Sequence, residues 1–361
     1  MENTEIKKDC VSKERIIQAI ENWGDSTIVW LHLLSLLGEK HQVSSKLNGI
    51  KISHNHQKFN LSLHSSCGTG KSWNTIILVK FLQGFADMPF IKELHGFFTP
   101  KALIQQIIEK PDATFYVDEA EQLLNDVTIR SLLRQMSFGK GFIAWQTSRE
   151  AQNISLVRFL GNTIMSRNDK LDSQGRIIDI SNEHLKANLD RAIIITLKPD
   201  INEMIRAKQR QYENHIDKGA WDWIAKKIAE LRQNPNEIDL DEQETKEIFE
   251  FWKQELRESR QENVSLRSFD KLIQLFARMK LFLGLDQDLI CICRNLGKRI
   301  IKTSIQSNLF SNFINEMPLT RADLAKKMSE ERGISLRQAQ RMVANALERG
   351  EIKEINQIIT P

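Results

Sequence analysis

The clearest chemical signal in the sequence is a short stretch with two glycines, a lysine and a serine. Residues 65–72 read Ser-Ser-Cys-Gly-Thr-Gly-Lys-Ser, after an alternating apolar run at 59–64 and before a helix-like run at 73–82. In such a strand–loop–helix arrangement, backbone N–H groups of the loop and of the helix N-terminus point at phosphate groups. The lysine reaches the β- and γ-phosphates, and the hydroxyl group after it ligates Mg²⁺. We therefore predict a phosphate-binding loop made of Ser66, Cys67, Gly68, Thr69, Gly70, Lys71 and Ser72, with Ser72 also a metal ligand.

One position departs from the usual pattern of such loops. Ser65 stands where the pattern has its first glycine. A serine there is expected to adopt a turn geometry that glycine adopts more easily. The alternative interpretation is a surface turn that happens to contain the sequence Gly-Thr-Gly-Lys-Ser.

Two adjacent carboxylates are the second candidate for phosphate chemistry. Asp118 and Glu119 follow the apolar run 114–117, which has the pattern of a buried parallel strand. Ligands bind beyond the carboxyl ends of parallel strands, so Asp118 is expected beside the phosphate-binding loop. There Asp118 could hold Mg²⁺ through water, and Glu119 could polarise an attacking water molecule. The alternative is a strand end with two solvated acids.

With both motifs in this order, the chain resembles the P-loop ATPases that have an extra strand and a catalytic glutamate, and among them the AAA+ group. The resemblance implies binding and hydrolysis of ATP with Mg²⁺. Asp118 would support the metal ion and Glu119 would activate water. It also implies a homo-oligomer in the form of a ring or spiral.

The stretch after the acidic strand permits two interpretations. Residues 141–148 could form the next core strand, with Gln146 or Thr147 as a polar residue at its end. Alternatively, they pair with residues 154–160 in a hairpin, and the core strand is 162–166, ending at Arg167 and Asn168. We prefer the second interpretation, because AAA+ ATPases keep a polar residue that senses the γ-phosphate at this strand end. A hairpin directly before this strand also resembles the arrangement in AAA+ proteins and superfamily 3 helicases that act on DNA. The alternative is a hairpin without a function of its own.

The resemblance suggests two further roles, for which three arginines are candidates. Arg191 precedes the last core strand, as does the AAA+ arginine finger, which reaches the nucleotide of a neighbouring subunit. Arg167 is our second choice for this role. Arg267 opens a helix in the expected lid and would contact the nucleotide from that side. Without the resemblance, each would be an ordinary residue at the end of an element.

The expected fold is α/β, with a three-layer P-loop NTPase core of AAA+ type built on a parallel sheet. A helical lid and a small winged-helix-like domain follow. We place an N-terminal helical segment at 1–58, the ATPase core at 59–200, the lid at 201–300 and the winged-helix-like domain at 301–361. Two helices are expected within 11–40 and one over 121–136. The strands are expected to stop after residue 200, with a loop at 233–239.

The end of the chain has the pattern of a helix-turn-helix unit, with helices at 319–328 and 336–349 and a wing strand at 351–355. The start of the second helix faces base edges in such domains, so Arg337, Gln338 and Arg341 are candidate DNA contacts, together with Ser335 and Gln340. Basic residues at 298, 299 and 302 are a candidate phosphate patch. Small helix-turn-helix units also bind proteins, which is the alternative.

Composition narrows the class of protein only in part. The net charge is +4, with 41% hydrophobic and 27% charged residues, as in an ordinary soluble globular protein. The four cysteines form no zinc or disulfide pattern and fit a reducing cytoplasm. His54 and His56 are expected to be solvated surface residues. The N-terminus does not resemble a secretory signal, and the apolar run 28–37 is too short to span a bilayer, so no membrane partner is expected.

These observations lead to two hypotheses about function. The first is an ATP-hydrolysing AAA+ ATPase that acts on DNA, as a motor, helicase or loader in replication or in a mobile element. The second is an ATP-dependent oligomeric switch or remodeller whose partner is a protein. A nucleotide-binding protein with little hydrolysis is a third interpretation, suggested only by Ser65.

Overall fold

The protein is described by a computed structural model. The residues described are 11–65, 71, 73–94, 99–124, 126–137, 141–145, 155–168, 191–197, 209, 216–259, 267–304, 320–332, 335–348, 353–355 and 358–360. In this part of the chain, no helix is long and apolar enough to cross a membrane.

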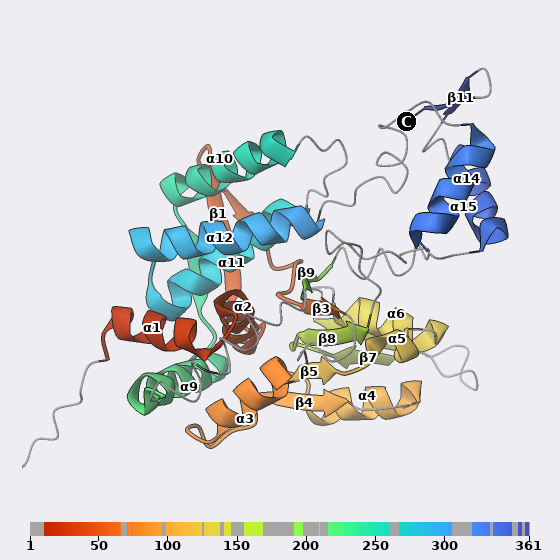
Figure 1. The fold of residues 1–361 in the computed structure, drawn as a ribbon. Coiled ribbons are helices and arrows are strands. Elements are labelled where there is room, and N and C mark those ends of the chain that lie inside the picture. The colour runs from red at the N-terminus through yellow and green to blue at the C-terminus, as the bar shows by residue number, and fades with distance from the viewer. Residues whose placement is uncertain are drawn as a thin grey trace, which may run out of the picture.

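A five-stranded sheet forms the centre of the α/β fold (Figure 1). Its strands are all parallel. Strand β8 follows β5 in the chain but lies between β3 and β5 in the sheet, which fits a P-loop-like core. The order across the sheet is β4 (Ile91–Leu94), β5 (Thr114–Val117), β8 (Thr163–Asn168), β3 (Leu61–Ser65) and β9 (Ile193–Thr196).

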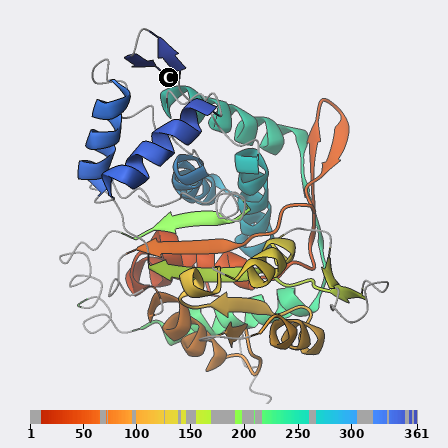
Figure 2. The same cartoon turned by 90° about the vertical axis from the view of Figure 1, so that its right-hand side faces the viewer.

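Both faces of the sheet are covered, because successive side chains of a strand point to opposite faces. Phe115 and Val117 pack into a cluster with helices α4 (Pro100–Glu109) and α6 (Val127–Met136). Tyr116, between them, packs into a second cluster with α3 (Leu78–Gln83) and with helices that precede and follow the sheet in the chain. The layers helix, sheet and helix are visible in Figure 2.

The helix expected over 121–136 is instead two helices. Helix α5 (Ala120–Leu123) ends early, and α6 starts anew at Val127. Asp126 causes the restart, because its side chain accepts hydrogen bonds from the backbone N–H groups of Thr128 and Ile129 and so caps α6. The run expected to be helical after the phosphate-binding loop is a π-helical turn, η1 (Trp73–Ile77), followed by α3.

The preferred interpretation of residues 141–168 is confirmed. Strands β6 (Phe142–Trp145) and β7 (Ser155–Arg158) pair antiparallel, and β8 is the core strand. The chain between β7 and β8 is pressed against the loop before β5. A Cβ atom on Gly161 would lie 1.8 Å from the carbonyl oxygen of Ala113. The backbone N–H of Leu160 donates to the carbonyl of Pro111 at 2.7 Å.

The prediction that strands stop after residue 200 is wrong. Strand β10 (Glu237–Leu240) lies in the range expected to be a loop and pairs parallel with β1 (Gln42–Leu47). The signal for it is short but present, since Ile238 and Leu240 are buried and alternate with exposed acids. Strand β2 (Ile50–Ser53) completes this second sheet, so the segment expected to be helical over 1–58 also contains two strands.

Helices that precede and follow the central sheet in the chain share one hydrophobic core. Arg278 in this core forms a buried ion pair with Glu39 at 2.9 Å and donates hydrogen bonds to the carbonyl groups of Leu34 and Gly38. The first pair of helices, expected within 11–40, is thus fastened to elements more than 200 positions later. The helices are α1 (Lys13–Trp23), α2 (Ser26–Leu36), α9 (Lys218–Gln233), α10 (Glu242–Ser259), α11 (Arg267–Leu283) and α12 (Gln287–Ser304).

The C-terminal elements have a small hydrophobic core of their own, to which α14 (Arg321–Arg332) and α15 (Leu336–Glu348) contribute. Strands β11 (Lys353–Ile355) and β12 (Ile358–Thr360) pair antiparallel beside them. Figure 1 shows this unit in blue, set apart from the central sheet.

Candidate functional site

The candidate site is at the carboxyl edge of the central sheet, where three neighbouring strands end. The register pairs Ser65, the last residue of β3, with Asn168, the last residue of β8. Val117 at the end of β5 pairs with Met165, so Asp118 comes next along the same edge. The carboxyl ends of parallel strands are where α/β proteins bind ligands.

Lys71 joins two of these strand ends through its side chain. Its Nζ atom donates hydrogen bonds to Oγ of Ser65 at 2.7 Å and to Oδ1 of Asn168 at 2.9 Å. The carbonyl oxygen of Ser65 lies 3.4 Å away. The side chain is almost entirely buried. The structure therefore brings together the lysine and the strand-end asparagine that the sequence identified separately.

The expectation that Ser65 adopts a turn geometry is wrong. Ser65 is fully buried and belongs to strand β3. Among the described residues other than glycine, only Asn48 and Glu119 have positive φ. Because Ser65 continues the strand, its hydroxyl group can point toward Lys71.

Asp118 is held in place by three hydrogen bonds to one carboxylate oxygen. Oδ1 accepts from the hydroxyl of Tyr116 at 3.1 Å, from the backbone N–H of Glu119 at 3.1 Å and from the hydroxyl of Ser166. These bonds fix the orientation of the carboxylate at the sheet edge. We did not identify Tyr116 and Ser166 from the sequence. Tyr116 could have been found from its position two residues before Asp118 on the same strand.

The backbone turns away from the direction of strand β5 at Glu119. Its backbone φ is 49°, in the left-handed region that few residues other than glycine adopt, and its side chain is exposed. Residues in this conformation cluster at functional sites.

The buried side chain of His32 contacts the backbone of Lys71 through Thr75. Nδ1 of His32 donates to the carbonyl of Ile28 at 2.7 Å, and its Nε2 lies 2.8 Å from Oγ1 of Thr75. The same hydroxyl lies 3.2 Å from the backbone carbonyl of Lys71. Burial lowers the pKa of His32 to about 4, opposed in part by the hydrogen bond with Ile28, so the imidazole is neutral at pH 7. No local sequence pattern pointed to this contact, because it joins α2 to the turn after the loop.

The chemistry of these groups fits a nucleotide with Mg²⁺. Lys71 offers a cation for phosphate, and Asp118 offers a carboxylate oxygen, the ligand type that Mg²⁺ prefers. The described residues contain no group of three or more metal-ligating side chains. Mg²⁺ typically takes one or two carboxylates and completes its shell with water and phosphate oxygens. The loop residues Ser66, Cys67, Gly68, Thr69, Gly70 and Ser72, and the alternative residues Gln146 and Thr147, lie outside the described residues.

The candidate arginines lie in three different places, and only Arg167, directly before Asn168, is near this edge. Arg191 precedes β9 at the amino edge of the sheet, where its Nη1 atom donates to the carbonyl of Arg134 at 3.2 Å. Arg167 is buried within β8, opposite His64 of β3. Arg267 is the first residue of α11. A role for Arg191 toward a neighbouring subunit, and for Arg267 toward the nucleotide, remains a prediction.

The expectation of two solvated histidines at positions 54 and 56 is wrong for the first. His54 is buried, and its Nδ1 atom lies 2.9 Å from Oδ1 of Asp270. His56 is exposed and lies 3.1 Å from Oδ2 of the same carboxylate. One acid of α11 thus fastens both imidazoles.

The C-terminal candidates for DNA contact lie on one exposed part of α15. Arg337, Gln338 and Arg341 are exposed, whereas Ala339 and Val343 face the small core. The upstream basic patch is partly neutralised by ion pairs. Nζ of Lys298 lies 3.3 Å from a carboxylate oxygen of Glu255, and Nη1 of Arg299 lies 3.7 Å from one of Asp25.

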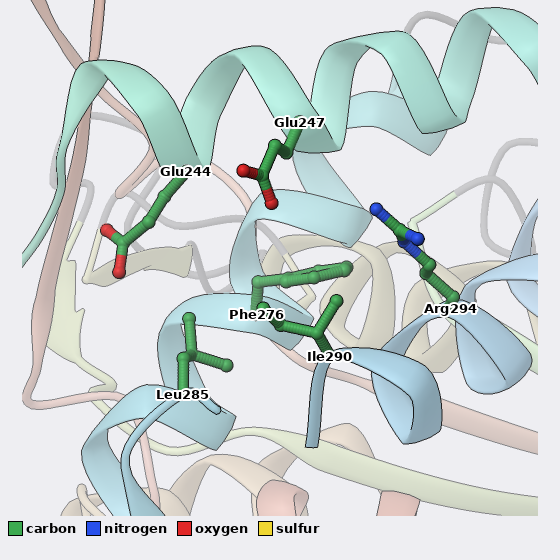
Figure 3. A pocket seen from close by; sticks show the side chains of 6 residues that line it. All are labelled: Glu244, Glu247, Phe276, Leu285, Ile290 and Arg294. Atoms are coloured by element: carbon green, nitrogen blue, oxygen red, sulfur yellow. The ribbon is translucent and has the colours of Figure 1, made fainter. Parts of the chain in front are cut away.

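A small pocket between α10, α11 and α12 is distinct from the candidate site. Figure 3 shows its lining of two acids, one arginine and three apolar side chains. Its volume of about 10 Å³ holds about one water molecule, so it cannot take a nucleotide. The lining residues are Glu244, Glu247, Phe276, Leu285, Ile290 and Arg294.

Comparison with known proteins adds little to this geometry. No protein-family model matches the chain, and no curated protein matches its sequence. One of the solved structures that resemble it is described as "SCCmec type IV Cch - active helicase". That similarity covers 96% of this chain and 56% of the other, at 11% identity and a TM-score of 0.34. The chain thus spans little more than half of that protein.

Proposed function

We propose that the protein is an AAA+ ATPase that hydrolyses Mg²⁺-bound ATP and acts on DNA. The observation that carries the proposal is the hydrogen bond of 2.9 Å between Nζ of Lys71 and Oδ1 of Asn168. It places the phosphate-binding lysine and the strand-end polar residue at the sheet edge that also presents Asp118. A surface turn with an accidental Gly-Thr-Gly-Lys-Ser sequence has no reason to produce this convergence.

The roles of the residues follow from what each group can do. Lys71 binds the β- and γ-phosphates, while Ser72 and Asp118 hold Mg²⁺. Glu119 accepts a proton from the attacking water molecule, and Asn168 orients that water. Most of the catalysis of phosphoryl transfer is positioning and electrostatic stabilisation, which a preorganised buried lysine and a fixed carboxylate can supply.

Membership of the AAA+ group is supported by the arrangement of the strands. Strand β8 lies between the strand of the phosphate-binding loop and the acidic strand, and the hairpin β6–β7 precedes it in the chain. In this proposal, helices α9 to α12, which follow the sheet in the chain, form the lid. An active oligomer in which Arg191 reaches the neighbouring nucleotide is part of the proposal.

Two exposed surfaces support DNA as the partner. The hairpin β6–β7 presents Phe142 and Leu156, which are 54% and 68% exposed, with Arg158 on the same face. Exposed aromatic side chains stack on bases, and arginines contact phosphates. Helix α15 presents Arg337, Gln338 and Arg341 as in a winged-helix domain. A protein partner is the second candidate, favoured by the net charge of only +4.

The direct test measures ATP hydrolysis with and without single- and double-stranded DNA. We expect turnover that DNA stimulates and that is lost in Glu119→Gln and in Lys71→Ala. Binding of a fluorescent ATP analogue separates the two variants, because Glu119→Gln should bind it more tightly than Lys71→Ala, whose binding is weakened but measurable. Turnover that is indifferent to DNA would favour the protein partner. ATP binding without turnover by the unmodified protein, at concentrations that allow oligomers, would reject the catalytic assignment.

A further inference from the structure

Ser65 occupies a position at which a phosphate-binding loop normally has no side chain. Its hydroxyl oxygen accepts a hydrogen bond of 2.7 Å from Nζ of Lys71, and both residues are buried. Hydrogen bonds to an ionised donor are about twice as strong as those between neutral groups. A glycine at this position could not supply the bond.

The buried ammonium group needs such partners. A charged group removed from water is costly unless it is hydrogen-bonded, and a lysine ammonium has three N–H donors to place. Oδ1 of Asn168 takes one donor at 2.9 Å and the hydroxyl of Ser65 takes another. The two acceptors lie on adjacent strands, at paired positions.

These two acceptors differ in whether their contact with Lys71 must be released when a phosphate group binds. Asn168 is proposed to orient water during hydrolysis, so its contact with Lys71 must be exchangeable. Ser65 is fixed within a strand and fully buried, so it can hold the lysine whether or not a phosphate is present. We infer that Ser65 is a positioning residue that keeps the Lys71 ammonium ordered at the sheet edge for binding the phosphates of ATP. This inference rests on the proposed function, because it assigns a role within the same site.

The test is a double-mutant cycle read out by the affinity for ATP. Isothermal titration calorimetry with ATP and Mg²⁺ would be applied to the full chain and to Ser65→Ala, Ser65→Gly, Ser65→Thr, Lys71→Ala and Ser65→Ala/Lys71→Ala. We expect Ser65→Ala and Ser65→Gly to weaken ATP binding about tenfold, as for the loss of a hydrogen bond to a charged group. Ser65→Thr keeps the hydroxyl group and should restore most of the affinity.

The cycle distinguishes positioning from a purely structural effect. If Ser65 acts through Lys71, Ser65→Ala has no further effect once Lys71 is replaced by alanine. An equal loss in both backgrounds would overturn the inference, as would a Ser65→Gly variant that binds ATP as tightly as the unmodified protein. The variants must retain the thermal unfolding midpoint of the parent protein, and Ser65→Thr serves where alanine impairs folding.

The affinity also separates this inference from the proposed hydrolysis. A protein that binds ATP without turnover would reject the catalytic assignment, yet the cycle would still decide the role of Ser65. A protein that binds no ATP would reject the proposed function and this inference together.

Discussion

His32 is the residue at which burial has the clearest energetic consequence for the site. It contacts Thr75, which in turn contacts the backbone of Lys71. Its pKa is about 4 in the folded protein because of burial, against 6.5 for an exposed imidazole. The folded state therefore binds fewer protons than the unfolded state between these two pH values.

We predict that the free energy of unfolding decreases as the pH is lowered from 6.5 to 4. A histidine with a lowered folded pKa favours the folded state above pH 6.5, and this contribution is lost as the pH falls toward 4. At pH 5 the loss from His32 alone is about 2 kcal/mol. Urea unfolding at pH 7.5 and pH 5.0 measures it. His32→Asn should be less stable at pH 7.5 but should lose about 2 kcal/mol less on acidification. Equal pH dependence in both proteins would contradict the assignment.

A second prediction concerns the hydroxyl group that orients Asp118. The hydrogen bond from Ser166 fixes one oxygen of the carboxylate proposed to hold Mg²⁺. Removing a partner of this kind commonly weakens metal binding by about tenfold or more. We therefore expect Ser166→Ala to raise the Mg²⁺ concentration needed for half-maximal ATP turnover about tenfold.

The matched comparison for this prediction is Tyr116→Phe. Its bond to the same oxygen is longer, at 3.1 Å, so the effect should be smaller. An unchanged Mg²⁺ requirement in Ser166→Ala would mean that Asp118 does not hold the metal ion.

The residues of the site divide into those that the sequence can predict and those that it cannot. Lys71, Asp118 and Asn168 each lie at a recognisable strand end or loop end, so local patterns identify them. Ser166 and His32 become relevant only through strand pairing and helix packing, which bring together residues far apart in the chain. For Ser65, the sequence predicts a turn geometry, whereas the residue continues strand β3, because the sequence alone does not show that its hydroxyl group pairs with Lys71.

At the scale of elements, apolar runs separated by helix-like stretches predicted the parallel sheet, whereas the hairpin β6–β7 was preferred because of the resemblance to AAA+ proteins. Strand β10 was missed because a segment of four residues with two acids, shortly after Pro235, resembles a loop until its partner β1 is known. The break between α5 and α6 was missed because Asp126 could be read as a solvated helical residue rather than as a cap. In both cases a tertiary or capping contact outweighed the local propensity.

Helix α15 allows a prediction about DNA binding. Arg337 and Arg341 are one turn apart and exposed, so together they can contact one stretch of DNA. We expect Arg337→Ala/Arg341→Ala to weaken binding to duplex DNA. The slope of the logarithm of the affinity against the logarithm of the salt concentration should decrease in magnitude by about one for each phosphate group that the variant no longer binds. Basal ATP turnover should not change, because the pair lies in a unit with its own core.

The matched control is Arg321→Ala, which removes an exposed arginine at the start of the neighbouring helix α14. Fluorescence anisotropy at several salt concentrations measures the affinity. Equal DNA affinity in the double variant and the parent protein would remove α15 as a DNA-binding surface and favour a protein partner for this unit.

At the scale of the whole molecule, the helices that precede and follow the central sheet in the chain pack with that sheet into one hydrophobic core, while α14 and α15 have a core of their own. Arg278 of α11 reaches Glu39 after α2, and the nearby Lys58 donates to the carbonyl groups of Phe159 and Gly161 beside the hairpin. Burial lowers the pKa of Lys58 to about 7, although Glu39 opposes that shift. These contacts link the amino edge of the sheet, the hairpin and the helices of the second sheet.

The position of Arg191 makes the oligomer testable. Within one chain it lies at the amino edge of the sheet and Lys71 at the carboxyl edge, so Arg191 cannot complete its own site without crossing the sheet. If it acts on nucleotide, it must act on that of a neighbour. We predict that Arg191→Ala and Lys71→Ala are each inactive alone, since an arginine finger contributes about a thousandfold or more to turnover. Mixed together, they should regain activity.

The reason for the regained activity is geometric. In a mixed assembly, the intact Lys71 of an Arg191→Ala subunit can face the intact Arg191 of a Lys71→Ala subunit. ATP turnover is measured over a series of mixing ratios, with native mass spectrometry to establish that mixed assemblies form. Arg191 also donates to the carbonyl of Arg134, so thermal unfolding of Arg191→Ala must first show that the fold is retained. Mixed assemblies without regained turnover would exclude action in trans, whereas full activity of Arg191→Ala alone would remove this residue from the mechanism.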